Sequence, residues 1–259
     1  MAYFDVDLYR GELTYDPPDK NKKIGVIALS TDVTAERDLV RILPMYRLGL
    51  YVTRVEFSNP TTPQNLHKMA PLISKAAGLI LPDERLDAIC YCCTAASVVI
   101  GDHAIEASVH TARPGVPVVT PSAAAVQALK AFGAKHISVV TPYLIETSQP
   151  MASYFEAQGL SLAKFLCLGL ESDVDMARVD RESIIKAVLA SQTQETDAFF
   201  LSCTALQALD VVREIEAQTG LPVVTSNQAC AWALAHHTQI KVDAVKWGRL
   251  FRQQWPYNS

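Results

Sequence analysis

Apolar and polar stretches alternate along the chain in blocks of strand and helix length. Short runs rich in aliphatic residues are typical of buried parallel strands, and the longer stretches between them carry the wider spacing of helices. This alternation predicts an α/β fold of parallel sheets with helices on both faces. The predicted strands are 23–29, 50–57, 87–93, 117–120, 136–143, 161–168, 197–203 and 221–225, and the predicted helices include 34–44, 66–73, 98–109, 122–131, 145–157 and 181–191.

Two stretches of the chain repeat one another. Residues 87–95 and 197–205 both open with Asp-Ala, continue through apolar residues and end in Cys-Thr-Ala. A second match, 115–120 with 220–225, follows in the same order. The offsets are 203 − 93 = 110 and 220 − 115 = 105 residues, so the sequence predicts a duplicated α/β unit.

Composition narrows the class of protein. With 259 residues and 49% hydrophobic content the chain can bury a substantial core, and a net charge of −4 offers no basic field for nucleic acid. No apolar run has the length of a membrane helix, and the N-terminus has no secretory pattern, so we expect a cytoplasmic protein with no membrane partner. Six cysteines without a framework pattern predict reduced thiols.

The repeated cysteines are the candidate reactive groups. Cys93 and Cys203 end equivalent strands, where a following helix would place each thiol near unpaired amides and lower its pKa. Thr94 and Thr204 add hydroxyl groups that can hold a carboxylate. Two facing thiols can exchange protons with a stereocentre, or one sulfur can add to a double bond and allow cis–trans rotation.

The other cysteines favour a structural role. Cys90, Cys92, Cys167 and Cys230 fit small buried hydrophobes, and alternation along a strand with no paired histidines argues against a metal site. No glycine-rich nucleotide motif is present, so no nucleotide cofactor is expected. Ligands of such sheets bind at the carboxyl ends of strands, which here carry 30–34, 93–97, 120–122, 141–143, 203–206 and 225–227.

Several of these motifs together resemble one superfamily. The set is 24–32, the two Cys-Thr elements, 141–143, 222–228 and 247–250. It is similar to the aspartate/glutamate racemase superfamily, in its branch of maleate cis–trans isomerases, arylmalonate decarboxylases and ectoine-utilisation proteins. The resemblance implies a cofactor-independent enzyme with two Rossmann-like halves and the active site in the cleft between them.

The resemblance also implies the domain division and the residues of the site. The expected division is an N-terminal arm (1–22), a first domain (23–121 plus 228–259) and a second domain (122–227). Cys93 and Cys203 would be the catalytic pair, and relatives commonly form homodimers or higher oligomers. The expected substrate-binding residues are Ser30, Asp32, Thr94, Tyr143, Asp173, Thr204 and Ala205.

Two positions depart from the maleate isomerases. Those enzymes carry asparagines that serve substrate carboxylates, where this chain has Asp32 and, by a looser match, Asp173. An ionised aspartate only accepts hydrogen bonds, so it suits a substrate with an amine or amidinium. The alternatives are a helix-capping role for Asp32 and a solvated loop charge for Asp173.

The leading hypothesis is an isomerase or epimerase of a small carboxylate in ectoine or hydroxyectoine utilisation, because 28–38 most resembles that group. A maleate-type cis–trans isomerase and an arylmalonate-type decarboxylase are the alternatives. Decarboxylases of this branch have glycine at the first cysteine site, so Cys93 argues against that activity. A ligand-binding protein without catalysis is a further alternative.

Overall fold

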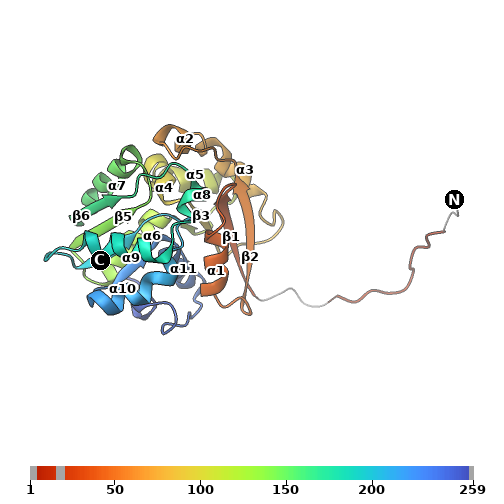
Figure 1. Cartoon of the computed structure of the whole chain (residues 1–259). Coiled ribbons are helices and arrows are strands. Elements are labelled where there is room, and N and C mark those ends of the chain that lie inside the picture. Colours follow the sequence, from red (N-terminus) through yellow and green to blue (C-terminus); the bar gives the residue numbers. More distant parts are fainter. Residues whose placement is uncertain (1–4, 16–20, 257–259) are drawn as a thin grey trace.

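The chain folds around two parallel sheets of four strands each. The computed structural model describes residues 5–15 and 21–256 (Figure 1). The first sheet has the order β2-β1-β3-β4 and the second β6-β5-β7-β8, which confirms the predicted α/β class. The strands are β1 (Lys22–Leu29), β2 (Leu48–Val55), β3 (Ala88–Cys92), β4 (Val118–Val119), β5 (His136–Thr141), β6 (Ser161–Cys167), β7 (Ala198–Leu201) and β8 (Val223–Thr225).

The two sheets have the same topology, as a duplicated unit requires. In each, the first strand pairs with the second on one side and with the cysteine-bearing third strand on the other. Ala28 is in register with Cys92, and Val140 is in register with Leu201 at the equivalent place. Because parallel strands end at one edge, Cys93 and Cys203 both lie at the carboxyl edge of their sheets.

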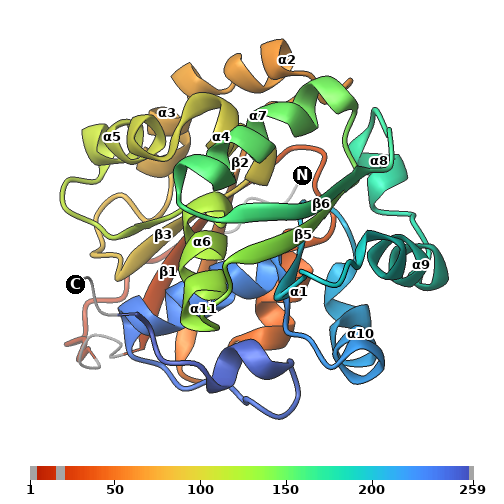
Figure 2. The same ribbon diagram turned by 90° about the vertical axis from the view of Figure 1, so that its left-hand side faces the viewer.

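Helices flank both sheets (Figure 2). The predicted helices 145–157 and 181–191 match α7 and α9, and the latter begins where Asp180 accepts a hydrogen bond from the Ser183 amide at 2.9 Å. The helices are α1 (Ala35–Ile42), α2 (Pro63–His67), α3 (Ile73–Gly78), α4 (Thr94–Ile100), α5 (Asp102–Ala112), α6 (Pro121–Ala131), α7 (Ile145–Ala157), α8 (Asp173–Met176), α9 (Arg181–Ser191), α10 (Val212–Thr219) and α11 (Ser226–Thr238), with 3₁₀ turns η1 (Ala70–Leu72), η2 (Ala208–Val211) and η3 (Arg249–Arg252).

Two predicted helices are interrupted. The stretch 66–73 falls over α2, η1 and the start of α3, because Pro71 has no amide hydrogen to continue a regular helix. The stretch 98–109 is divided between α4 and α5 at Gly101, whose φ of +95° is readily adopted only by glycine. The hydrophobic pattern continues across both interruptions, so the pattern alone predicts a longer helix.

The last helix, α11, lies in the centre of the molecule. It packs against α6, against α1 and against β3 of the first sheet. Eleven of its thirteen residues are buried, and its four alanines allow close approach on several sides. The packing on the first sheet is compatible with the domain division 23–121 plus 228–259 and 122–227, which stays a prediction.

The predicted arm, 1–22, is only partly described. Residues 1–4 and 16–20 lie outside the described residues, and β1 already begins at Lys22. Residues 5–15 have no regular secondary structure and extend away from the α/β body (Figure 1). Within the described chain, no helix has the length and apolar character needed to cross a membrane. The cytoplasmic location stays a prediction.

Candidate active site

Cys93 lies between β3 and the first turn of α4. Its backbone is extended, with φ −154° and ψ 109°, and it takes the cap position of the helix that the sequence predicts after it. The Ala96 amide hydrogen-bonds the thiol, so the sulfur faces the positive end of α4. The residue is only 6% exposed.

Cys203 has a different local structure, and the predicted helix directly after it is wrong. Its φ is +101°, in the region that favours glycine, and the chain continues through a bend before the 3₁₀ turn η2 and then α10. A cysteine held at such a φ costs about 1–3 kcal/mol, which surrounding contacts must offset. One such contact is the Cys203 amide, which donates to Ser226 Oγ at 3.1 Å.

The N-terminus of α11 connects the two Cys-Thr elements. Ser226 Oγ also accepts a hydrogen bond from the Thr94 hydroxyl at 2.8 Å. The Thr204 hydroxyl in turn donates to the Cys92 carbonyl at 3.2 Å, directly across the two halves. The two cysteine loops therefore form one buried hydrogen-bonded unit.

Asn227, the next residue of α11, holds the second loop. Its amide group donates to the Thr204 carbonyl and to Asp38 Oδ2, both at 3.0 Å. Sequence reasoning did not single out Ser226 or Asn227 individually. The signal available for them is the capping box of Thr225 and Gln228, which fixes where α11 begins and therefore which residues face the cysteines.

Both thiols have raised pKa values, contrary to the lowering that their positions predict. Burial is the largest cause for Cys93, and the nearby charges of Asp173, Cys203 and Asp32 raise its pKa further. Burial, then Asp173 and Asp32, raise the pKa of Cys203 as well. Hydrogen bonds from the Ala96 and Ala205 amides lower the pKa values of Cys93 and Cys203, but burial and the nearby charges raise them by more. Both side chains are therefore neutral thiols in this buried state.

Tyr143 lies beside Cys203. Its hydroxyl hydrogen-bonds the Cys203 thiol, an interaction that lowers the pKa of that thiol against the effect of burial. The same hydroxyl is 3.3 Å from Ser202 Oγ. Burial raises the pKa of Tyr143 well above its ordinary value, so the phenol keeps its proton and acts as a donor. Its predicted contact with substrate stays a prediction.

Asp32 both caps a helix and leaves one oxygen free. Its Oδ1 accepts the amides of Thr34 and Ala35 at 2.7 and 2.8 Å, so Asp32 rather than the Thr34 hydroxyl caps α1. Its Oδ2 is buried, and no hydrogen-bond partner for it is found among the described residues. A buried carboxylate oxygen without a partner is costly unless a donor reaches it.

Asp173 is buried at 4% exposure, so the alternative of a solvated loop charge is wrong. It begins α8 and accepts a hydrogen bond from the Thr31 hydroxyl of the other half. Burial raises its pKa, with the Asp32 charge adding to the effect. The Asp173 charge raises the pKa of Cys203 more than the Asp32 charge does, and it raises the pKa of Cys93 as well.

Several hydrogen bonds join the two halves. Besides the Thr31–Asp173 bond, the Thr61 amide donates to the Glu171 carbonyl at 2.8 Å. The Thr147 hydroxyl donates to the Thr61 carbonyl at 2.6 Å. Cys93 and Cys203 are both buried, so a molecule from solvent reaches the two thiols only when the surrounding structure opens.

The other residues predicted to bind substrate differ in their burial and in their hydrogen bonds. Ser30 is exposed, and its hydroxyl accepts the Phe57 amide at 3.0 Å. Ala205 is buried and supplies an amide to the Cys203 sulfur. Thr94 and Thr204 have their hydroxyls engaged between the halves. The substrate contacts of all these residues stay predictions.

Comparison with known proteins gives the family. Residues 74–251, more than two thirds of the sequence, match the arylmalonate decarboxylase family. The chain belongs to this family. Among curated relatives, the maleate isomerase of Nocardia farcinica is 26% identical over 90% of this chain and 96% of its own. The arylmalonate decarboxylase of Bordetella bronchiseptica is 29% identical over 46% of this chain and 50% of its own.

Solved structures share the fold. A variant of the maleate isomerase Iso from Pseudomonas putida S16, with maleate, has a TM-score of 0.83 at 21% identity, covering 91% of this chain and 99% of that one. A Nocardia farcinica maleate cis–trans isomerase mutant with a covalently bound succinylcysteine intermediate has a TM-score of 0.81 at 23% identity, covering 90% and 99%. The family therefore includes isomerases and decarboxylases on the same two-sheet fold. The resemblance to the ectoine-utilisation group has no counterpart among these matches.

Within this family member, three further cysteines form a separate cluster. Cys92 Sγ lies 3.5 Å from Cys90 Sγ, and Cys230 of α11 hydrogen-bonds both. All three are fully buried where α11 packs on β3. Their burial and mutual contacts support the structural role that the sequence indicates.

Proposed function

We propose that this protein is a cofactor-independent cis–trans isomerase of a small unsaturated carboxylate, with Cys93 and Cys203 as its catalytic pair. The observation that carries the proposal is the hydrogen-bonded unit in which both Cys-Thr loops meet at Ser226. It holds two buried thiols from equivalent strand ends close enough that the charge of Cys203 raises the pKa of Cys93. The near full-length similarity to maleate isomerases, against half-length similarity to a decarboxylase, supports isomerisation.

Cys93 is the better nucleophile of the two. It caps a regular helix, whereas Cys203 is followed by a bend, so the positive end of a helix dipole stabilises only the Cys93 thiolate. Burial is the largest cause of its raised pKa, so opening of the halves to admit substrate lowers that pKa and releases the proton to water. Closure then holds the thiolate against the substrate.

The reaction follows from two sulfurs on opposite sides of a double bond. The Cys93 thiolate forms a C–S bond to one alkene carbon, and the electron pair moves toward the carboxylate of the other carbon. The Cys203 thiol protonates that carbon, leaving a single bond that rotates. After the rotation, the Cys203 thiolate removes a proton from that same carbon, and the C–S bond to Cys93 breaks. These two steps give the trans alkene and restore the Cys203 thiol and the Cys93 thiolate.

Backbone amides provide the sites for substrate carboxylates. The start of α4 and the Thr204–Ala205 segment present N–H groups beside the two sulfurs. These donors also stabilise the charge that develops on a carboxylate oxygen during sulfur addition. Tyr143, a protonated phenol that hydrogen-bonds Cys203, would donate to the same oxygen or assist that thiol.

The test is incubation of the purified protein with maleate in deuterated water, followed by proton NMR. We expect a trans product that is lost in both Cys93→Ala and Cys203→Ala. Cys167→Ala, on the edge strand β6, is the matched cysteine control and retains turnover. Turnover that survives either of the first two substitutions contradicts the two-cysteine mechanism.

A specific observation favours a second candidate substrate. Asp32 Oδ2 is buried without a partner in the described chain, and Asp173 adds a second buried acid. A carboxylate substrate that also carries an amidinium would supply the missing donor and would remove the charges that raise both thiol pKa values. Such compounds include ectoine and its hydroxylated form, so the second candidate is an isomerase or epimerase in their breakdown.

Parallel incubations distinguish the two substrates. Ectoine, hydroxyectoine, their ring-opened derivatives and maleate are compared for isomer formation and deuterium incorporation. Asp32→Asn keeps an oxygen for the α1 cap but replaces the free acceptor by a donor, so we expect weaker turnover of the amidinium compound and better turnover of maleate. An unchanged preference counts against a cationic substrate.

A further inference from the structure

The N-terminal arm, residues 5–15, displays apolar side chains that its own chain does not cover. Val6 is 95% exposed, Leu8 80% and Tyr15 85%, and Tyr9 and Leu13 are also largely exposed. Five large apolar side chains within eleven residues far exceed the scattered exposure that is normal on a surface. The arm extends away from the body (Figure 1), so the described part of its own chain leaves these side chains uncovered.

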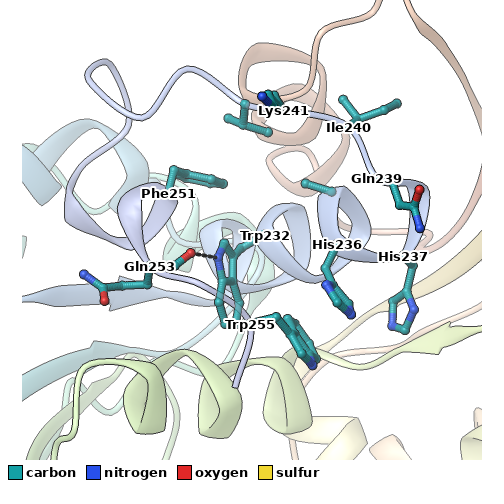
Figure 3. A pocket seen from close by; sticks show the side chains of 11 residues that line it. Trp232, His236, His237, Gln239, Ile240, Lys241, Phe251, Gln253 and Trp255 are labelled. Carbon is teal, nitrogen blue, oxygen red and sulfur yellow. Dashed lines mark hydrogen bonds between the residues drawn. The ribbon is translucent and has the colours of Figure 1, made fainter. Parts of the chain in front are cut away.

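An aromatic groove on the body matches the character of the arm. It lies between the C-terminal half of α11 and the tail that follows η3, and encloses about 670 Å³ (Figure 3). The partly exposed Trp255 packs on the buried Trp232 with ring centroids 4.6 Å apart, and the His236 ring stacks on Trp255 with centroids 4.5 Å apart. Phe251 and Ile240 complete the apolar lining.

The charges of the two surfaces are complementary. The arm carries Asp5, Asp7 and Glu12 against one positive charge, Arg10, which gives a net charge of −3 + 1 = −2. The groove has Lys241 at its edge, and no acidic side chain is among the residues that line it. Complementary charge favours association of these two surfaces and orients the extended segment along the groove.

The groove is also continuous with the place where the arm leaves the body. A neighbouring cavity shares His237 and Gln239 with the groove and is lined by Lys22, the first residue of β1. In a two-fold dimer that joins these faces, the arm of each copy begins beside the groove of the other. The exchange of arms then forms two identical arm–groove contacts, as an isologous interface requires.

We propose that this protein forms a two-fold dimer by arm exchange, in which residues 5–15 of each copy occupy the aromatic groove of the second copy. The apolar side chains of the arm pack on Trp255 and Phe251, which are partly exposed, and its acidic residues face Lys241. The dimer contact lies away from the cysteine pair, so it is independent of the proposed reaction.

The first test compares the mass in solution of the full chain and of arm variants by sedimentation velocity over a range of concentrations. We expect the unaltered chain to be a dimer and Leu8→Asp/Leu13→Asp to raise the dissociation constant at least about a hundredfold, because two apolar contacts are lost per arm. Both residues are exposed within the chain, so circular dichroism remains unchanged. Leu79→Asp, at a 65% exposed apolar residue outside arm and groove, is the matched control and remains dimeric.

A charge reversal tests the groove itself. Lys241→Glu weakens the dimer by repelling the acidic arm, and Asp5→Lys/Asp7→Lys on the same chain restores it. A full chain that is monomeric, with its arm on its own groove or on no surface, overturns the proposal. A dimer that withstands Leu8→Asp/Leu13→Asp, or a Lys241→Glu dimer of unchanged affinity, overturns it equally.

Discussion

The Thr94 hydroxyl donates to Ser226 Oγ at 2.8 Å, across 132 positions of sequence. Thr94 follows the first cysteine of the pair, and Ser226 begins the helix that follows the last strand of the other sheet. The same Ser226 oxygen accepts the Cys203 amide at 3.1 Å. A single buried hydroxyl therefore determines the spacing of two loops that no local sequence feature connects.

Replacement of Ser226 by alanine is expected to lower kcat with little change in KM. The substitution leaves the Thr94 hydroxyl and the Cys203 amide without their acceptor, and costs about 2–4 kcal/mol of unfolding free energy. Ser138→Ala is the control, because that buried hydroxyl bonds the Ser191 carbonyl far from the cysteines. Denaturant unfolding and steady-state kinetics separate the effects. Equal loss of kcat in both variants would assign Ser226 a purely structural role.

Neutralising Asp173 is expected to lower the pKa of both thiols. Asp173 is the largest charge effect on Cys93 and on Cys203, and it raises both values, so Asp173→Asn removes an opposing charge. The ultraviolet absorbance of thiolate, followed against pH, moves to lower pH relative to the unaltered chain. Glu182→Gln, an exposed acid paired with Lys186, is the control and leaves the titration unchanged. A titration that does not move in Asp173→Asn contradicts the assignment.

The raised thiol pKa values also predict how stability depends on pH. A group whose pKa is higher folded than unfolded stabilises the fold fully below its unfolded pKa, and that contribution is lost as pH rises. The unfolded value for cysteine is about 8.5, so the unfolding free energy falls above that pH. The fall is shallower in Cys93→Ala and Cys203→Ala, since one titrating thiol is removed in each. Urea unfolding at several pH values measures it, and an equal slope in all three proteins would exclude these thiols as the cause.

Loss of the Thr31 hydroxyl is expected to open the site. That hydroxyl bonds Asp173 across the two halves, so Thr31→Val weakens closure and exposes the cysteines more often. Mass spectrometry should detect faster alkylation of Cys93 and Cys203, while KM for substrate rises. Thr111→Val, whose hydroxyl bonds only the Ala107 carbonyl of its own helix, is the control. No increase in alkylation would mean that the other contacts between the halves keep the site closed.

Asp102 is expected to be a major contributor to stability although it is outside the site. Its carboxylate accepts hydroxyls of Thr120 at 2.5 Å and of Ser122 and Tyr154 at 2.7 Å, joining α5 with α6 and α7. Asp102→Ala leaves three donors without an acceptor and costs about 2–4 kcal/mol, measured by denaturant unfolding. Glu182→Ala, an exposed residue in an ion pair, costs less than about 0.5 kcal/mol. If Asp102→Ala loses no more unfolding free energy than Glu182→Ala, water satisfies the three hydroxyl donors in place of the carboxylate.

Much of the fold was predictable because its signals are local. The repeated Asp-Ala…Cys-Thr-Ala strings lie on β3 and β7, which occupy the same place in two sheets of the same order. The helix 145–157 has its predicted ends despite an internal proline. The helix predicted directly after Cys203 is absent because a tertiary contact, the Cys203 amide on Ser226, favours a φ of +101° over a helical turn.

Sequence predicts which side chains lie at the strand ends but not their electrostatics. Sequence indicates which groups end the strands, yet the raised pKa of each thiol depends on burial by the opposite half. The burial of Asp173 was not predictable either. A loop acid is expected to be solvated, whereas this one is buried and accepts a hydrogen bond from Thr31 of the other half. Ser226 and Asn227 acquire their contacts only when α11 returns to the centre of the molecule.

The sequence by itself determined the α/β class, the duplication and the two cysteines, since periodicity and repeated strings express short-range preferences of the chain. Only the tertiary structure decided that both thiols are protonated, that Asp32 has one free buried oxygen, and that Ser226 joins the two loops. These properties depend on distances between residues far apart in sequence and on the exclusion of water, which arise only when the two halves pack together.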